Sequence, residues 1–327
     1  MKDKKCVLCG NKLFNLVLKV REEIKGQEFK LIKCVNCGLA HILPIPRNLE
    51  ELYSDEEYYA YNDLEKSESG AIYDRLLGRI GRYSISRTFD GKRCGIENLI
   101  KEFAFKTVSH RFSGHRRLVF ERKKGEAKRI LDIGTGGGMF LDVMRSLGWK
   151  AYGVDVSAIS VRKLKERGFR VFHGELEQAD FLCDYFDVVW ASFVMEHARN
   201  PLTFLQEICR ILKPGGKAII CIPNFGSFQS KFFQENWSML SIPQHIYHFD
   251  NSCLEGLIDK AGLKLTFRRL YSGGSIVPSF QNRMKSKRAN HFFTFVSLVI
   301  ERFLVASPFF CDAMEVYVGK KYRLRRR

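Results

Sequence analysis

From residue 128 onward, short apolar runs alternate with amphipathic stretches of helical period. The runs are rich in Ile, Val and Phe, which is typical of strands buried on both faces of a sheet. The stretch from Pro201 to Leu212 has helical spacing, and a Lys-Pro-Gly-Gly turn at 213–216 follows it. This alternation predicts an α/β domain around a largely parallel sheet. The predicted strands are 129–133, 151–155, 169–172, 185–192, 218–223, 263–271 and 314–320.

Two further alternating runs, Phe14–Val20 and Glu28–Lys33, predict a hairpin near the start of the chain. A Cys-x-x-Cys-Gly unit stands on each side of it. The two-residue spacing lets a tight turn direct both thiolates at one metal ion, and four thiolates complete a tetrahedral shell. A ribbon of this kind binds nucleic acid, binds protein or binds neither, and its sequence leaves the three open. We predict a zinc ribbon over residues 1–45, with a structural zinc ion held by Cys6, Cys9, Cys34 and Cys37.

Residues 46–127 separate this ribbon from the alternating domain. They begin with an aromatic and acidic stretch at 49–61 and become basic from 75 to 128. We expect a linker followed by a helical region. Its basic side chains form either a solvated helix surface or a face that handles phosphate groups.

The stretch 291–310 repeats its aromatic and aliphatic residues at helical spacing. Glu301 and Arg302 lie in its middle, which argues against a membrane-spanning helix. We predict an amphipathic helix within an insertion at 275–310. The helix either covers core or rests on a membrane surface, and flanking basic clusters at 285–288 and 323–327 suit the second reading.

Composition adds a strong positive charge to this picture. The chain has 54 Lys plus Arg against 36 Asp plus Glu, a net charge of +18, with 13% aromatic residues. These values exclude an acidic solvating protein and a disordered basic tail, and they indicate an anionic partner. Residues 283–327 hold eleven Lys plus Arg against three Asp plus Glu. That local surplus favours a phosphate-bearing lipid or a membrane surface over generic nucleic-acid binding.

The start of the sequence has no apolar stretch after its charges, so we expect no secretory signal. Ten cysteines then indicate thiols or metal ligands rather than disulfides. Together these features predict a cytoplasmic protein, with peripheral contact at the inner membrane face as the extension that the basic segment suggests.

The turn after the strand at 129–133 is rich in glycine and begins with a carboxylate, Asp132. Asp155 ends the next strand about 20 residues past the glycines, where it can accept hydrogen bonds from both hydroxyls of a ribose. An NAD-binding fingerprint would need a third glycine where Met139 or Leu141 stands. Asp132 would repel a pyrophosphate, but it suits a cofactor with an ammonium group and a sulfonium. The glycines of the turn are Gly134, Gly136 and Gly138.

Residues 128–224 resemble a class I S-adenosylmethionine (SAM)-dependent methyltransferase. The segments LDIGTGGG, GVDVS, GELEQADF, FDVVWASFVMEH and RILKPGGKAIICIPN carry the resemblance, in the right order and spacing. It implies a Rossmann-like seven-stranded sheet within a methyltransferase domain over 128–327. It also implies that Asp132 and Gly134 hold the methionine part of SAM while Gly136 and Gly138 line the loop. Asp155 would hold the ribose, and Glu175 with Leu176 would flank the adenine.

The segment after the strand at 218–223 is expected to form an acceptor insertion at 225–250, because ligands bind beyond the carboxyl ends of parallel strands. Relatives of this kind carry a similar P-x-H-x-x-H-F stretch here. We predict His245 as the general base, with His248 either supporting it or capping a helix that begins near Ser252. His197, after Glu196, is expected to shape the pocket or cap a turn.

The acceptor is expected to be a sugar or glycan intermediate, nucleotide-linked or lipid-linked, methylated on oxygen. The ribbon followed by an LYSDEEYY-like segment resembles bacterial enzymes associated with surface polysaccharides. The segment 191–196 lacks the Asn/Asp-Pro-Pro-Tyr/Phe motif of enzymes that methylate exocyclic amino groups of bases. An RNA methyltransferase that uses the ribbon and the basic surface is the main alternative, and a ribbon-based binding protein without activity ranks third.

Overall fold

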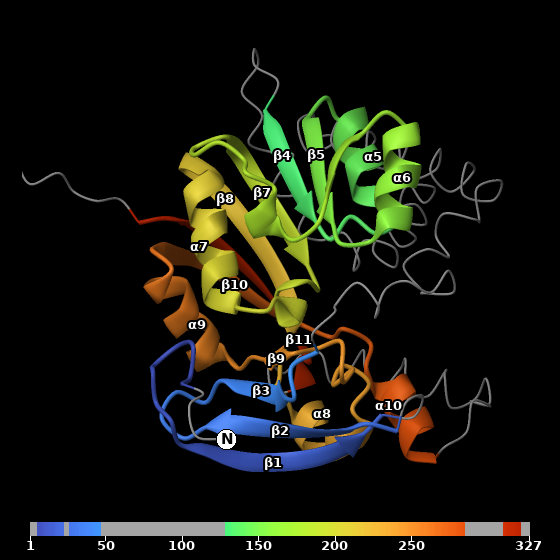
Figure 1. Cartoon of the computed structure of the whole chain (residues 1–327), viewed down its shortest axis with the longest axis vertical. Coiled ribbons are helices and arrows are strands. Elements are labelled where there is room, and N and C mark those ends of the chain that lie inside the picture. Colours follow the sequence, from blue (N-terminus) through green and yellow to red (C-terminus); the bar gives the residue numbers. More distant parts are fainter. Residues whose placement is uncertain (1–4, 23–25, 47–127, 285–309, 322–327) are drawn as a thin grey trace, which may run out of the picture. The chain divides into compact units, whose positions relative to one another are not determined.

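The computed structural model describes residues 5–22, 26–46, 128–284 and 310–321 (Figure 1). These residues divide into two compact units: 128–173 belong to the unit of residues 53–173, and the others belong to the unit of residues 1–52 with 174–327. Nearly all of the predicted linker and helical region, and the amphipathic stretch at 291–310, lie outside the described residues.

In the unit of residues 53–173, the described residues from 128 to 173 form parallel strands and two helices. The register pairs Ile130 with Ala151 and Gly153 with Val171. The apolar runs of the strands face the apolar sides of the helices, so a buried cluster forms around Leu141, Leu164 and Val171. The elements are β4 (Arg129–Ile133), α5 (Met139–Ser146), β5 (Lys150–Asp155), α6 (Ala158–Glu166) and β6 (Arg170–His173).

The second unit contributes a parallel pair of strands, β7 (Phe186–Ser192) and β8 (Leu212–Pro223). Antiparallel strands β11 (Ala313–Lys320) and β10 (Leu263–Tyr271) extend it, with β11 beside β8. The strand order is β10-β11-β8-β7 in this unit and β4-β5-β6 in the unit of residues 53–173. These seven strands and the helices between them confirm the predicted Rossmann-like α/β fold.

The predicted turn at 213–216 lies inside β8 rather than before it. Phe186 pairs with Leu212, but Val188 pairs with Lys217, so four residues of β8 bulge opposite one residue of β7. Gly215 has a φ of 78°, which favours glycine. The residues 213–216 do form a bulging turn, and β8 continues on both sides of it.

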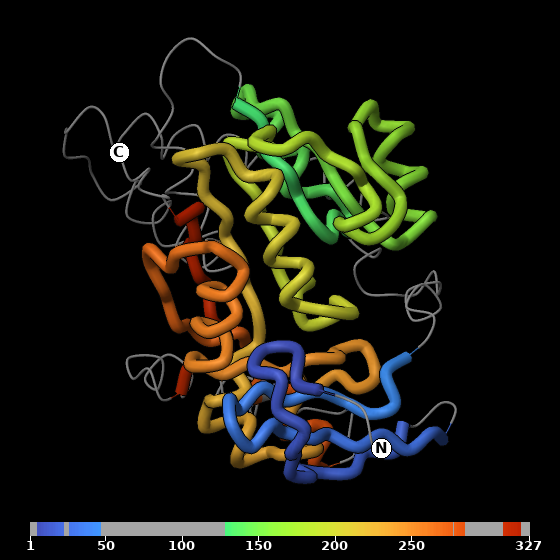
Figure 2. The backbone as a smooth tube through the Cα atoms, turned by 60° about the vertical axis from the view of Figure 1, so that its left-hand side comes forward, coloured from blue at the N-terminus to red at the C-terminus, as the bar shows by residue number. Residues whose placement is uncertain are grey.

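The N-terminal hairpin is β1 (Phe14–Arg21) with β2 (Glu28–Cys34), as predicted. Strand β3 (Ala40–Leu43) extends it, and a short strand from the other end of this unit, β9 (Tyr247–His248), completes a four-stranded sheet in the order β1-β2-β3-β9. Figures 1 and 2 both show the blue ribbon strands beside orange segments of the same unit. The ribbon and the predicted acceptor segment therefore share one sheet.

The helices of this unit begin at recognisable caps. The side chain of Asn200 caps α7 (Pro201–Ile211), which has proline at its first position. The side chain of Asp250 caps α9 (Asn251–Lys260) by accepting from the N–H of Cys253 at 3.0 Å. The helix cap is therefore Asp250, which rules out the second of the two alternatives for His248, that it caps this helix. The other helices in the described residues of this unit are α8 (Phe228–Phe233), α10 (Ile276–Met284) and the short 3₁₀ helices η3 (Leu176–Gln178), η4 (Met195–His197) and η5 (Gln234–Asn236).

Candidate active site

The turn after β4 has the backbone that its glycines predict. Gly134, Gly136 and Gly138 have φ values of 72°, 47° and 77°, a region that costs side-chain-bearing residues energy. Gly138 is also the residue before α5, and a Cβ there would lie 2.1 Å from Cδ2 of Leu164. The loop is therefore built around bare backbone, which a ligand can approach closely.

Asp155 holds this loop in place. Its Oδ2 accepts from the backbone N–H of Gly136 at 2.8 Å and from the hydroxyl of Thr135 at 3.1 Å. Its Oδ1 accepts from the N–H of Ser157 at 2.8 Å. The sequence predicted Asp155 only as a ribose ligand and predicted no role for Thr135. The structure adds a second task, because the carboxylate joins the end of β5 to the glycine loop.

Asp132 is 4% exposed at the end of β4. Burial raises its pKa well above the usual value, and the nearby charge of Asp155 raises it further. A cation bound beside Asp132 would relieve both effects. The carboxyl is thus suited to a ligand with a positive group, which is what the ammonium and sulfonium of SAM present.

Glu175 and Leu176 lie in the second unit, at the start of η3. The carboxylate of Glu175 accepts from Nε of Arg199 at 2.9 Å, and its backbone N–H donates to the side chain of Gln178 at 2.9 Å. Leu176 is buried. These contacts fix the turn that the resemblance assigns to the adenine.

A group of acid and base side chains gathers where the turn after β7 meets the segment before β9. Donor atoms of Glu196, His197 and His245 all lie within 4.8 Å of one another. Nε2 of His245 is 4.0 Å from Oε1 of Glu196, and the rings of His197 and His245 meet edge to face with centroids 4.7 Å apart. Residues about 50 positions apart in the sequence thus form one cluster.

Backbone contacts set the orientation of this cluster. Nδ1 of His245 lies 2.8 Å from the carbonyl oxygen of Met239, so Nδ1 carries the proton and Nε2 carries the lone pair. Nδ1 of His197 lies 2.9 Å from the carbonyl oxygen of Gln244. Burial lowers the pKa of His245 well below its usual value and that of His197 to about 4. Both rings are therefore neutral at pH 7.

His248 lies on β9, within the same cluster. It is 3% exposed, its ring centroid is 6.3 Å from that of His245, and it hydrogen-bonds to the backbone of His245. Burial lowers its pKa to about 3. This position suits the predicted supporting role, since the ring of His248 contacts the chain that carries His245.

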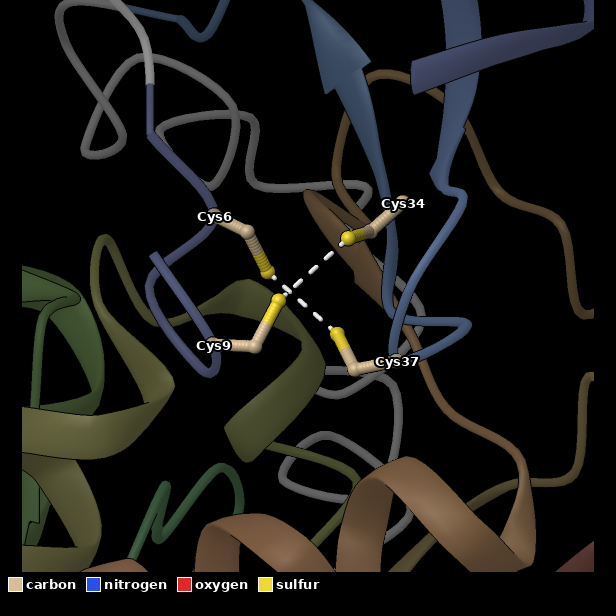
Figure 3. A group of neighbouring side chains, drawn as sticks. All are labelled: Cys6, Cys9, Cys34 and Cys37. Carbon is tan, nitrogen blue, oxygen red and sulfur yellow. Dashed lines mark hydrogen bonds between the residues drawn. The ribbon is translucent and has the colours of Figure 1, made fainter. Parts of the chain in front are cut away.

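The four predicted cysteine ligands converge on one point (Figure 3). Sγ of Cys6 is 3.4 Å from Sγ of Cys37, Sγ of Cys9 is 3.5 Å from Sγ of Cys34, and all four lie within 4.8 Å of one another. Zinc–sulfur bonds of about 2.3 Å in a tetrahedron place sulfurs roughly 3.8 Å apart. The four thiols thus fit the donor set and the spacing of a closed zinc site.

The ribbon also contacts α9, in the same unit. Nζ of Lys260 donates to the carbonyl oxygen of Leu8 at 2.6 Å, and the side chain of Leu8 lies 3.4 Å from the Cβ position of Gly256. Lys33 of β2 lies 3.7 Å from the carboxylate of Asp250. Sequence reasoning missed this docking, because no local pattern marks residues that meet across more than 200 positions.

The family model described as a methyltransferase domain matches residues 102–266, half of the chain. The chain belongs to this methyltransferase-domain family. The family match and the sheet order together support an enzyme that uses SAM as its methyl donor.

Curated relatives match over a shorter stretch. A ubiquinone biosynthesis O-methyltransferase from Maricaulis maris is 36% identical over 133 residues, 38% of this chain and 52% of its own length. One from Cereibacter sphaeroides is 33% identical over 150 residues, 42% of this chain and 61% of its own length. An uncharacterized protein from Methanocaldococcus jannaschii is 35% identical over 107 residues, 33% of this chain and half of its own length. The chain thus spans about half the length of the curated relatives it matches.

Solved structures are similar at lower identity. A SAM-dependent methyltransferase from Archaeoglobus fulgidus covers 66% of this chain and 94% of its own, with a TM-score of 0.44 and 20% identity. Another from Mesorhizobium loti covers 62% and 95%, with a TM-score of 0.44 and 14% identity.

Proposed function

We propose that this enzyme transfers the methyl group of SAM to a hydroxyl oxygen, with His245 as the general base. The observation that carries the proposal is the fixed tautomer of His245. Because its Nδ1–H donates to the carbonyl of Met239, the Nε2 lone pair is directed away from the backbone. A hydroxyl is a weak nucleophile, so a positioned base that takes its proton assists the transfer.

The protonation state of His245 suits this role. A general base has to be neutral before it acts, and burial lowers the pKa of His245 well below its usual value. The carbonyl of Met239 fixes the ring, while His248 contacts the backbone behind it. SAM, when bound, supplies a methyl carbon made electrophilic by its positively charged sulfur. Nε2 of His245 would take the proton of the acceptor hydroxyl as that oxygen accepts the methyl group and the methyl–sulfur bond breaks, which leaves a neutral thioether.

We assign the SAM ligands to the residues that the resemblance implies. Asp132 provides a buried carboxyl for the positive groups of the methionine part, and the bare backbone of Gly134, Gly136 and Gly138 admits close contact. Asp155 accepts from the ribose hydroxyls with the lone pairs that its loop contacts leave. Glu175 and Leu176 flank the adenine in this assignment.

For the acceptor, the sequence favours a sugar or glycan intermediate, nucleotide-linked or lipid-linked. The names of the curated relatives point to a different hydroxyl, on an intermediate of ubiquinone biosynthesis. A base that can deprotonate a hydroxyl serves either acceptor. Methylation of RNA has no such support from the relatives.

The ribbon is proposed to hold one structural zinc ion through Cys6, Cys9, Cys34 and Cys37. Four thiolates leave no coordination position for substrate, so the metal would stabilise the fold and take no part in catalysis. The pairing of β3 with β9 supports a role in shaping the acceptor segment.

We also propose that the basic surface holds a phosphate-bearing or lipid-linked acceptor near an anionic membrane. None of the described helices is long and apolar enough to cross a bilayer. Contact through charge and an amphipathic face would be peripheral.

The decisive experiment supplies methyl-labelled SAM to the purified enzyme with fractions of nucleotide sugars, polar lipids, prenylated phenols and RNA. We expect label on a hydroxyl oxygen of a small or lipid-linked acceptor, identified by mass spectrometry after cleavage. Label on nitrogen, or only in the RNA fraction, would contradict the proposal. The His245→Gln variant should bind SAM with unchanged affinity by calorimetry and transfer little label.

A further inference from the structure

Glu196 carries a buried carboxyl group that has no role in the proton transfer to His245 described above. It lies on η4, directly after β7, and its side chain is 1% exposed. Neither oxygen has a hydrogen-bond partner within the described part of the chain. Burying a carboxyl without partners is costly, so its retention in this place indicates a task.

Two imidazoles lie near Glu196, those of His197 and His245. Nε2 of His245 is 4.0 Å from Oε1 of Glu196. Two contacts hold the residues at this spacing: the N–H of Ile246 donates to the carbonyl of Glu196 at 2.8 Å, and His197 bonds to the carbonyl of Gln244. The gap is too long for a direct hydrogen bond. An oxygen atom about 2.8 Å from each group fits between them.

We propose that Glu196 is the counter-charge for His245: its carboxylate stabilises the imidazolium that forms when Nε2 takes the acceptor proton. This inference rests on the proposed function. Glu196 acts through His245 and is a positioning residue. The hydroxyl O–H bond breaks, the proton binds Nε2, and the positive charge then lies beside a negative one. With a neutral partner the same step would leave an uncompensated buried charge.

The resting state of the pair follows from its burial. Burial raises the pKa of Glu196 to about 8, so at pH 7 the carboxyl is protonated and the imidazole is neutral. The reactive form, with ionised Glu196 and neutral His245, becomes populated as the pH rises through about 8. Turnover should therefore show an acid limb with its midpoint near pH 8.

The other titratable groups that face the pair keep their charge state in this range. His197 and His248 have lowered pKa values of about 4 and about 3, so both are neutral above pH 6. Burial raises the pKa of Cys221, which stands on β8 and senses the charges of Glu196 and Glu315. Burial also raises that of Tyr271, beside Cys221. The limb near pH 8 is thus assigned to Glu196.

The test compares wild type with E196Q, E196D and an exposed carboxylate control, E235Q on η5. In E196Q we expect turnover to fall roughly 10²-fold, the limb near pH 8 to disappear, and SAM affinity to stay unchanged. E196D should recover part of the turnover and keep the limb. E235Q should match wild type.

A second readout needs no acceptor. With ¹³C-labelled histidine, the ring signals of His245, assigned by loss in H245Q, should shift with a midpoint near pH 8 in wild type and E196D but not in E196Q. An unchanged profile in both readouts for E196Q would overturn the proposal. So would a second divalent metal ion per chain that E196Q loses, because a metal would then occupy the gap. If wild type methylates no hydroxyl, the proposed function fails, and the ring signals still decide whether Glu196 and His245 are coupled.

Discussion

The backbone N–H of Ile246 donates to the carbonyl oxygen of Glu196 at 2.8 Å. This bond joins the turn after β7 to the segment before β9, and it places His245 next to a buried carboxyl. The pairing of base and carboxyl proposed for the enzyme depends on that junction.

The His245→Gln variant tests the base. Glutamine has no nitrogen lone pair to take a proton, so kcat should fall by roughly 10²–10⁴-fold while the dissociation constant for SAM stays the same. Steady-state kinetics and calorimetry measure the two. Ser241→Ala, an exposed change in the same loop, is the control and should keep its activity. A His245→Gln enzyme with near wild-type turnover would remove His245 from the mechanism.

Glu196 is predicted to lower stability at high pH. Its pKa is about 8 in the folded protein against a usual 4.5, so the unfolded chain releases this proton first as the pH rises. The free energy of unfolding should therefore fall between about pH 4.5 and pH 8, by on the order of 4 kcal/mol. E196Q should be more stable than wild type at pH 8.5, and the gain should vanish near pH 4. Urea denaturation of both proteins between pH 4 and pH 8.5 measures this difference in the free energy of unfolding. A stability gain of E196Q that does not depend on pH would contradict the raised pKa of Glu196.

The Asp155→Asn variant should loosen the glycine loop. An amide cannot accept from both the Gly136 side and the Ser157 side, so one donor group loses its partner at a cost of about 1–3 kcal/mol. We expect a lower melting temperature and weaker SAM binding by calorimetry. Asp142→Asn weakens two partly exposed ion pairs of α5, with Arg145 and with Arg167, and should cost about 1 kcal/mol or less. Equal losses in the two variants would argue against the loop contact.

Gly138→Ala should lower stability in two ways, through the positive φ and through a clash of the new Cβ with Leu164. A substitution at Gly168 measures the first effect alone. Gly138 and Gly168 have similar positive φ values, 77° and 79°, but a Cβ at 138 would lie 2.1 Å from Leu164, whereas a Cβ at 168 meets nothing within 4 Å. Gly168→Ala should cost about 1–2 kcal/mol for the backbone alone, and Gly138→Ala should cost a further 1–3 kcal/mol or so. Chemical denaturation compares them, and equal costs would show that Leu164 moves aside freely.

Metal analysis should find about one zinc ion per chain. Cys37→Ser should release it, lower the melting temperature and reduce methyl transfer, because β3 would no longer hold β9. Cys183→Ser removes an exposed thiol outside the ribbon and should change none of these. A Cys37→Ser enzyme that lacks zinc yet keeps full activity would separate the ribbon from the acceptor site.

The sequence predicted those features that local patterns encode. Apolar runs and the glycine turn predicted the strands from β4 to β8. The cysteine spacing predicted that four thiols converge, and they do. The cap at Asp250 was not predicted, although aspartate is a preferred residue at the start of a helix. The approach of Glu196 to His245 could not be predicted, since it depends on how two loops separated by about 50 residues meet. The one feature of the sequence that pointed to this site was the pair Glu196 and His197, which follows a buried strand.

The pairing of Ala40 with His248 has a consequence for dividing the chain. A cut after residue 45 follows the boundary of the predicted zinc ribbon, but it separates two strands that are joined by backbone hydrogen bonds. Each fragment would then carry an unsatisfied strand edge. The N-terminal part thus provides a strand, β3, that pairs with β9 of the remaining chain. The two parts should therefore be expressed, exchanged or redesigned only together.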